Sequence, residues 1–263
     1  MTGATAAQQD EPNILVEVSG GVQIVTINRP HVRNAINHAT AVDIAAAMDE
    51  LDARDDLVAG VITGAGTSFC AGMDLKAFLD GERPSTPERG FAGLVEKPPT
   101  KPLIAAVNGP AIAGGFEIVL ACDLIVAADD AIFGLPEVKR GLVAAAGGLL
   151  RLPRRIPYHV AMEWALSGEY VSAKRAHEVA LVNRLVPKAA VLTEALALAT
   201  GIAANSPLAL RVTKQTLVES VDWPADEAFD RQREISEPVR ASEDALEGAR
   251  AFKETRPPVW KGR

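Results

Sequence analysis

Two glutamates, Glu117 and Glu137, stand in stretches that are otherwise apolar. Glu117 follows the loop GPAIAGGF at residues 109–116, and Glu137 follows Leu135 and Pro136 after a short apolar strand. Burying a carboxylate costs free energy unless the group finds a partner. Each glutamate alone is also explained as an acid favoured by the dipole of a helix N-terminus. Together they suit a pair acting on one molecule, because unequal burial lets two carboxylates divide acid and base roles.

Signatures of other chemistries are weak or missing in the sequence. GAGTSF at residues 64–69 begins like a dinucleotide fingerprint, but it lacks the third glycine and opens no helix. There is no G-x-S-x-G motif, and the four histidines form no zinc-binding pattern. The two cysteines, Cys70 and Cys122, match no metal spacing and are predicted to be free thiols. Carboxylate chemistry is therefore favoured over a Rossmann, serine hydrolase or zinc enzyme.

Glycine-rich loops precede the elements that must position these acids. Residues 58–75 and 102–118 share one layout: an apolar strand, a loop with glycine, and a helix that opens near an acid. A third glycine pair, at 147–148, leads into another helix. Glycine lets backbone amides approach a ligand at a helix start. We interpret the three segments as a strand-and-helix unit that is used repeatedly.

The remaining patterns predict an α/β protein with helices at its C-terminal end. Strands are expected at 14–18 and 22–27, joined by a Gly-Gly turn, and a helix capped by Thr40 at 40–54. Short buried strands are expected at 124–128 and 131–133. The predicted later helices cover 158–166, 172–180, 188–205, 207–219, 223–240 and 242–253. No strand is expected beyond 186, so the last helices form a layer that packs against a neighbour.

The composition of the chain limits which partners it can bind and how it is divided into parts. The chain has 263 residues, 48% of them hydrophobic, and a net charge of −7, which disfavours nucleic acid and anionic membrane surfaces. Residues 1–13 lack a signal-peptide pattern, and acids interrupt the apolar run at 118–133, so we expect a cytoplasmic protein without a membrane span. The expected parts are a flexible tail at 1–12, a core at 13–200 and a helical region at 201–263.

Several ordered motifs resemble the enoyl-CoA hydratase/isomerase, or crotonase, superfamily over residues 14–263. They are NRPHVRNAIN at 28–37, SFCAGMDLKAF at 68–78, the stretch from NGPAIAGGFE to KRGL at 108–142, and AGGLLRLPR at 146–154. The resemblance implies a crotonase-type α/β spiral of repeated ββα units with a helical C-terminal trimerisation region. It further implies a homotrimer, or a hexamer built from two trimers.

The same resemblance implies a site and a reaction. Glu117 and Glu137 match the two catalytic glutamates of the hydratases, with Glu117 taking a proton from water and Glu137 delivering one to Cα of an enoyl-CoA. The backbone amides of Met73 and Gly114 match the oxyanion hole that holds the thioester oxygen. No metal or cofactor is implied, since coenzyme A arrives as part of the acyl-CoA substrate.

The coenzyme A side of the site is also implied by this resemblance. The expected lining residues are Ala71, Gly72, Asp74, Leu75 and Lys76. Arg29 and Arg33 are candidates for phosphate contacts, although either is equally explained as a solvated surface charge.

Three readings of the activity stay open. Hydration of a trans-2-enoyl-CoA leads, and hydration of crotonobetainyl-CoA, the reaction of carnitinyl-CoA dehydratase, is the alternative within the family. Ala144, Ala145 and Ala146 stand where relatives carry proline and polar or glycine residues, which favours an apolar acyl chain. A non-catalytic acyl-CoA-binding role is the third reading, and both retained glutamates count against it.

Overall fold

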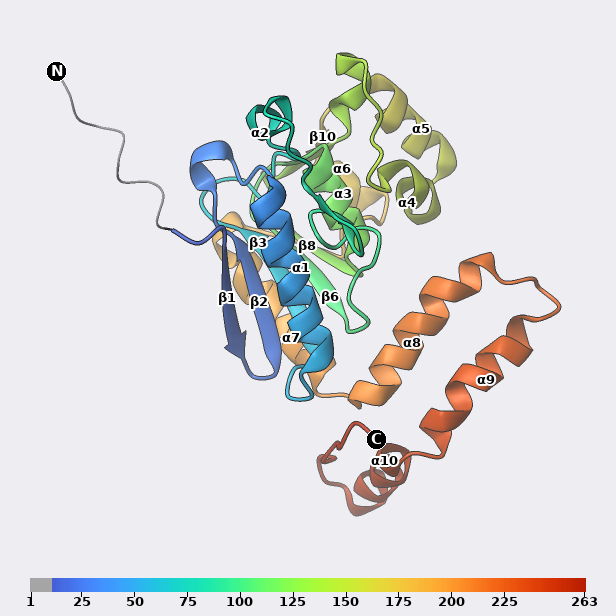
Figure 1. Cartoon of the computed structure of the whole chain (residues 1–263). Coiled ribbons are helices and arrows are strands. Elements are labelled where there is room, and N and C mark those ends of the chain that lie inside the picture. The colour runs from blue at the N-terminus through green and yellow to red at the C-terminus, as the bar shows by residue number, and fades with distance from the viewer. Residues whose placement is uncertain (1–10) are drawn as a thin grey trace.

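The chain is described by a computed structural model for residues 11–263, so all but the end of the predicted tail at 1–12 lies outside the described residues (Figure 1). A six-stranded sheet forms the centre, in the order β1-β2-β3-β6-β8-β11. Its strands are β1 (Ile14–Ser19), β2 (Val22–Ile27), β3 (Ala59–Gly64), β6 (Leu103–Val107), β8 (Leu124–Ala128) and β11 (Arg184–Val186). Only β1 runs antiparallel to its neighbour. Its inner strands β3 and β6 are fully buried because helices cover them, as parallel strands require, whereas the edge strand β1 is mostly exposed.

A second, three-stranded sheet lies beside the first and carries the strands that precede both glutamates. It consists of β10 (Val171–Ser172), β9 (Ile132–Gly134) and β7 (Ala111–Ile112), in that order. β7 and β9 run parallel, with Ile112 opposite Gly134. A separate hairpin joins β4 (Ser85–Thr86) to β5 (Gly90–Phe91).

Helices on both sides of the central sheet complete the core. In Figure 1, α1 (His38–Ala53) lies in front of the sheet and α7 (Val191–Ala203) behind it. The other core helices are α2 (Leu75–Leu79), α3 (Gly114–Ala121), α4 (Gly148–Arg155), α5 (Tyr158–Ser167) and α6 (Ala173–Glu178), with 3-10 turns η1 (Pro30–Val32), η2 (Pro136–Arg140) and η3 (Lys188–Ala190). A further 3-10 turn, η4 (Ser220–Asp222), belongs to the C-terminal region. The last three helices, α8 (Pro207–Glu219), α9 (Ala228–Arg240) and α10 (Glu243–Glu254), project away from this core.

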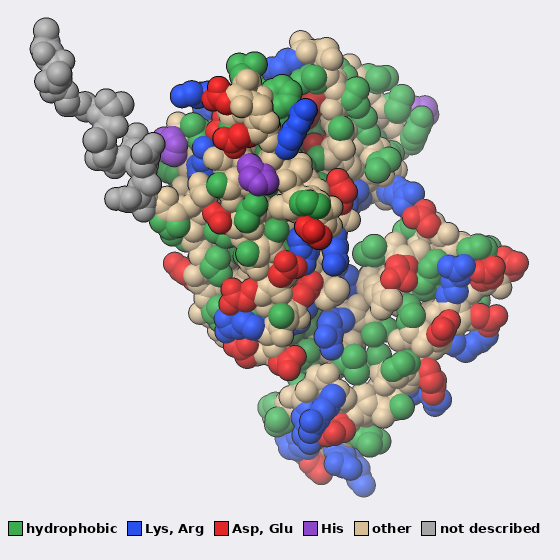
Figure 2. All heavy atoms as spheres, viewed as in Figure 1, with side chains coloured by type: hydrophobic (Ala, Val, Ile, Leu, Met, Phe, Trp, Pro, Cys, Tyr) green, Lys and Arg blue, Asp and Glu red, His purple; other side chains and the backbone are tan. Residues whose placement is uncertain are grey.

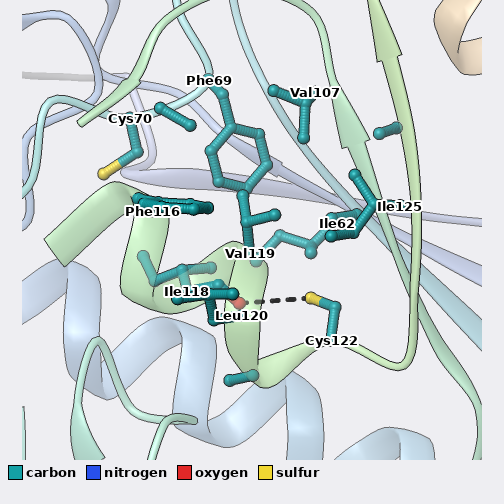
Figure 3. Close-up of a cluster of buried hydrophobic side chains, with 14 of the residues drawn as sticks. Ile62, Phe69, Cys70, Val107, Phe116, Ile118, Val119, Leu120, Cys122 and Ile125 are labelled. Carbon is teal, nitrogen blue, oxygen red and sulfur yellow. Dashed lines mark hydrogen bonds between the residues drawn. The ribbon is translucent and has the colours of Figure 1, made fainter. Parts of the chain in front are cut away.

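All eight residues of α3 are buried, which makes this helix the centre of the apolar core. Figure 3 shows Phe116 and Val119 of α3 beside Phe69 and residues of the central strands. Cys70 and Cys122 are buried free thiols here, as predicted, and burial raises the pKa of both to about 12.

Helix boundaries differ from the predicted ones where capping or turns decide them. The helix predicted from Thr40 begins at His38, because the Asn37 side chain caps it by accepting from Thr40 N at 3.0 Å. The helix predicted from residue 223 begins at Ala228, after a turn in which Glu227 N donates to Pro224 O. The predicted core boundary after residue 200 falls inside the last turn of α7, which packs on the central sheet.

Among residues 11–263, no single helix is both long and apolar enough to cross a membrane. The pair Lys188–Ala203 and Pro207–Asp222, bent by 107°, meets those criteria of length and composition only when taken together.

Candidate active site

The small sheet brings the two glutamates to one place. Helix α3 begins directly after β7, and η2 begins directly after β9. The two connections are tied together where Ala113 N donates to Gly134 O at 2.8 Å. Glu117 lies in the first turn of α3 and Glu137 in the first turn of η2. Both line one cavity of about 450 Å³.

Glu117 is a buried carboxylate with two backbone donors. Its Oε1 accepts hydrogen bonds from Ala146 N at 2.8 Å and Gly148 N at 2.9 Å. Burial raises the pKa of Glu117, and the charge of Glu137 adds to the rise, while the two amides and Arg151 oppose it. Because Oε1 already accepts two hydrogen bonds, Oε2 is the oxygen of Glu117 that remains available to a ligand in the cavity.

Glu137 has a different environment. Its Oε2 is buried and has no hydrogen-bond partner among the described residues. Burial raises the pKa of this carboxyl, opposed by a hydrogen bond from its own backbone and by Arg140. A proton on Glu137 relieves the cost of an unpartnered buried anion, whereas Glu117 has donors that stabilise its charge. The geometry therefore suits Glu117 as the base and Glu137 as the acid.

Two backbone amides face the same cavity. Met73 and Gly114 both line it, and neither N–H donates a hydrogen bond to any residue in the described part of the chain. Their loops are in contact, because a Cβ on Gly72 would lie 3.0 Å from Gly114 N. Ala113 holds φ at +54°, an unusual conformation for a residue with a side chain, and it orients the amide of Gly114. Two convergent free donors are what a developing oxyanion needs.

The residues predicted for the coenzyme A side divide into two groups. Ala71 and Leu75 line the cavity together with Met73, whereas Gly72 is buried and is not among its lining residues. Asp74 caps α2 by accepting from Lys76 N and Ala77 N, and Lys76 is exposed outside the cavity lining.

The structure gives Arg29, a predicted candidate for phosphate contact, partners inside the protein. Its guanidinium donates to Ala35 O and pairs with Asp74 at 3.1 Å, with 13% of the side chain exposed, so it holds the loop before α2. Arg33 is exposed but does not line the cavity. The arginines that do line it are Arg83 and Arg140. Arg140 could have been proposed from its place three residues after Glu137; nothing in the sequence marked Arg83.

Sequence reasoning also missed three residues around the glutamates. Phe91 lies against Gly114, where any added Cβ would overlap its ring. Glu96 lines the cavity, and Arg151 donates to Val95 O. No group of three His, Cys, Asp or Glu side chains able to hold a metal ion occurs among residues 11–263.

Comparisons with known proteins show which proteins the chain resembles. The family model described as "Enoyl-CoA hydratase/isomerase" matches residues 17–263. The chain is 42% identical to "Enoyl-CoA hydratase EchA19" of Mycobacterium tuberculosis, over 98% of this chain and all of that protein. It is 42% identical to "Carnitinyl-CoA dehydratase" of Escherichia coli K12, over 93% and 97% of the two chains. The crystal structure of enoyl-CoA hydratase EchA1 from Mycobacterium marinum superposes with a TM-score of 0.95 at 55% identity, covering 96% of this chain and 100% of that one.

Proposed function

Because the chain belongs to the enoyl-CoA hydratase/isomerase family, we propose that its paired glutamates and free amides catalyse the reversible hydration of a trans-2-enoyl-CoA. The protein is a hydro-lyase of the enoyl-CoA hydratase type, and its product is a 3-hydroxyacyl-CoA. The predicted α/β fold of the crotonase type is confirmed by the structural similarity. The observation that carries the proposal is the pair of unlike carboxylates in one cavity with two unpaired amides.

The proposed step begins with the thioester oxygen between the N–H groups of Met73 and Gly114. Water lies between the two carboxyl groups, and Glu117 Oε2 takes its proton as the oxygen attacks Cβ. Electrons of the Cα–Cβ bond move toward the thioester, and the two amides stabilise the enolate oxygen. Glu137 then gives its proton to Cα. The proposed reaction calls for no cofactor beyond the coenzyme A of the substrate.

The proposal is tested by mixing the purified protein with crotonyl-CoA and following the loss of enoyl absorbance. Formation of 3-hydroxybutyryl-CoA supports it. Tight binding of several enoyl-CoAs with no product by mass spectrometry would instead favour a non-catalytic acyl-CoA-binding role.

The activity should depend on pH through Glu117, which must be ionised. Because burial raises the pKa of Glu117 above its ordinary value of 4.5, kcat/KM falls as pH drops through that raised value. Arg151 opposes the rise, so Arg151→Met raises the pKa of Glu117 further and moves the acid limb to higher pH.

The measurement is kcat/KM for crotonyl-CoA against pH, and its apparent pKa values belong to the coupled pair of glutamates. Arg154→Met is the control, since Arg154 is exposed and pairs with Asp222. The role given to Arg151 is contradicted if the acid limb of the pH profile moves to lower pH in Arg151→Met, or if it moves by the same amount in both variants.

We propose that the protein assembles as a homotrimer, or as a hexamer of two trimers, through its C-terminal helices. Neither α8 nor α9 has a single buried residue. Large apolar side chains on these helices and on α10 are exposed: Leu217, Val218, Phe229, Leu246 and Phe252. Figure 2 shows green patches on this lobe, which stands apart from the core. Such surface marks an interface between protein chains.

Phe229→Asp should therefore lower the oligomeric state. Phe229 is 75% exposed in the single chain, so a charge costs little there unless an oligomer buries it. Light scattering after size exclusion is expected to show a shift toward monomer, and Asp230→Asn on the same exposed helix turn serves as the control. A wild-type protein that is already monomeric contradicts the assembly.

A further inference from the structure

The ring of Phe91 fills the space beside Gly114, one of the two proposed oxyanion donors. A Cβ added at Gly114 would lie 2.4 Å from Phe91 Cζ, well inside the ~3.5–4.0 Å at which non-bonded carbon atoms rest. The three heavy atoms nearest to such a Cβ all belong to this ring. Phe91 also lines the cavity that contains Glu117 and Glu137, and the proposed hydration step does not use it.

The backbone that carries Phe91 is fixed by its surroundings. Phe91 pairs with Ser85 in the hairpin β4-β5. The next residue, Ala92, is fully buried and holds φ at +53°, a conformation that persists only where neighbouring structure imposes it. Gly93 is pressed against α1, because a Cβ there would lie 2.1 Å from Ala41 O. A ligand that collides with the ring of Phe91 therefore cannot displace this backbone at low cost.

The proposed position of the thioester places the reacting carbons relative to the ring. The thioester oxygen accepts a hydrogen bond from Gly114 N at about 2.9 Å, the usual length of such a bond. Cα is two bonds from that oxygen, so it lies in the same part of the cavity as Phe91. Glu137 needs free access to Cα, while water and Glu117 need free access to Cβ. A branch on Cα is therefore directed into space that Phe91 already fills.

We propose that Phe91 is a specificity-determining residue that excludes enoyl-CoA substrates with a branch at Cα. The inference rests on the proposed hydratase function and narrows its substrate class to acyl chains that are unbranched at this carbon. A branch at Cβ is not restricted by the ring. Small side chains, Ala145 and Ala146, line the cavity there, and Ala146 contacts Glu117, the base that acts at Cβ.

The test compares kcat/KM for three thioesters: crotonyl-CoA, 2-methylcrotonyl-CoA with a branch at Cα, and 3-methylcrotonyl-CoA with a branch at Cβ. Phe91→Ala opens the space beside Gly114 and should raise the ratio of 2-methylcrotonyl-CoA to crotonyl-CoA by about tenfold, the usual effect of one poorly fitting methyl group. The ratio for 3-methylcrotonyl-CoA should change by less than about twofold. Intrinsic reactivity cancels, because each ratio is compared between enzymes acting on the same substrates.

Two further variants make the outcome specific. Phe91→Leu keeps most of the apolar volume and should raise the 2-methylcrotonyl-CoA ratio by a smaller factor. Phe78→Ala is the matched control, since Phe78 lines the same cavity from α2 and is not among the atoms nearest to a Cβ at Gly114. It should leave both ratios unchanged.

The inference is overturned if neither Phe91 variant raises the 2-methylcrotonyl-CoA ratio by more than about twofold. An equal rise for 3-methylcrotonyl-CoA overturns it as well, because the ring would then act on bulk in general rather than on Cα. A wild-type enzyme that does not hydrate crotonyl-CoA at all counts against the hydratase function instead. In that case, calorimetric affinities of the same three thioesters still decide whether the ring excludes the branch.

Discussion

Glu137→Gln is expected to lower kcat for hydration of crotonyl-CoA by about 10²–10⁴, the usual contribution of a positioned general acid. Glutamine fills the same volume and can still form hydrogen bonds, but it has no proton to transfer to Cα. The buried Oε2 of Glu137 has no partner among the described residues, so the substitution breaks no hydrogen bond of that atom. Affinity for an unreactive acyl-CoA such as butyryl-CoA should therefore stay within a few-fold of the wild type.

A matched variant separates loss of chemistry from loss of charge. Glu163→Gln removes a carboxylate from an exposed position on α5 and should leave kcat unchanged. Initial rates from the enoyl absorbance give kcat, and calorimetry gives the affinity. If Glu137→Gln keeps more than a tenth of the wild-type kcat, the acid role assigned to this residue is wrong.

Local patterns in the sequence predicted the long elements of the fold well. β2 spans the expected residues 22–27 because all of its residues except Gln23 are β-branched, and α8 spans the expected 207–219 because Ser206 caps it and proline opens it. The start of α1 was displaced because an asparagine side chain outside the apolar pattern caps it. Capping by one side chain decides such boundaries more than periodicity does.

The assembly of the site was harder to predict from the residues alone. Glu117 and Glu137 meet because β7 pairs with β9, and β7 has only two residues, too few to show a period. Phe91 and Glu96 lie on or just after the equally short hairpin β4-β5, in the least regular part of the chain. The internal ion pair of Arg29 with Asp74 was also not predicted, because nothing in the sequence indicates that these two residues, 45 positions apart, lie together.

The second large effect is expected from Gly72→Ala, which should lower kcat by about 10²–10³ through the oxyanion hole. Gly72 has φ at +92°, and a Cβ there would lie 3.0 Å from both Gly114 N and the Cβ of Ala113. The alanine must therefore push apart the two loops whose amides, on Met73 and Gly114, are proposed to hold the thioester oxygen. These amides act most strongly on the charge that develops in the transition state, so kcat should fall more than affinity for acyl-CoA.

Gly81→Ala distinguishes this effect from simple backbone strain. Gly81 has nearly the same φ, +90°, but a Cβ there meets nothing within 4 Å. Both alanines carry the cost of a left-handed conformation, on the order of 1–2 kcal/mol, so both variants should melt a few degrees below the wild type. Only Gly72→Ala should lose kcat, because only at Gly72 does the added methyl group face the amide of Gly114. Equal kcat values for the two variants would show that contact between the loops does not position the oxyanion donors.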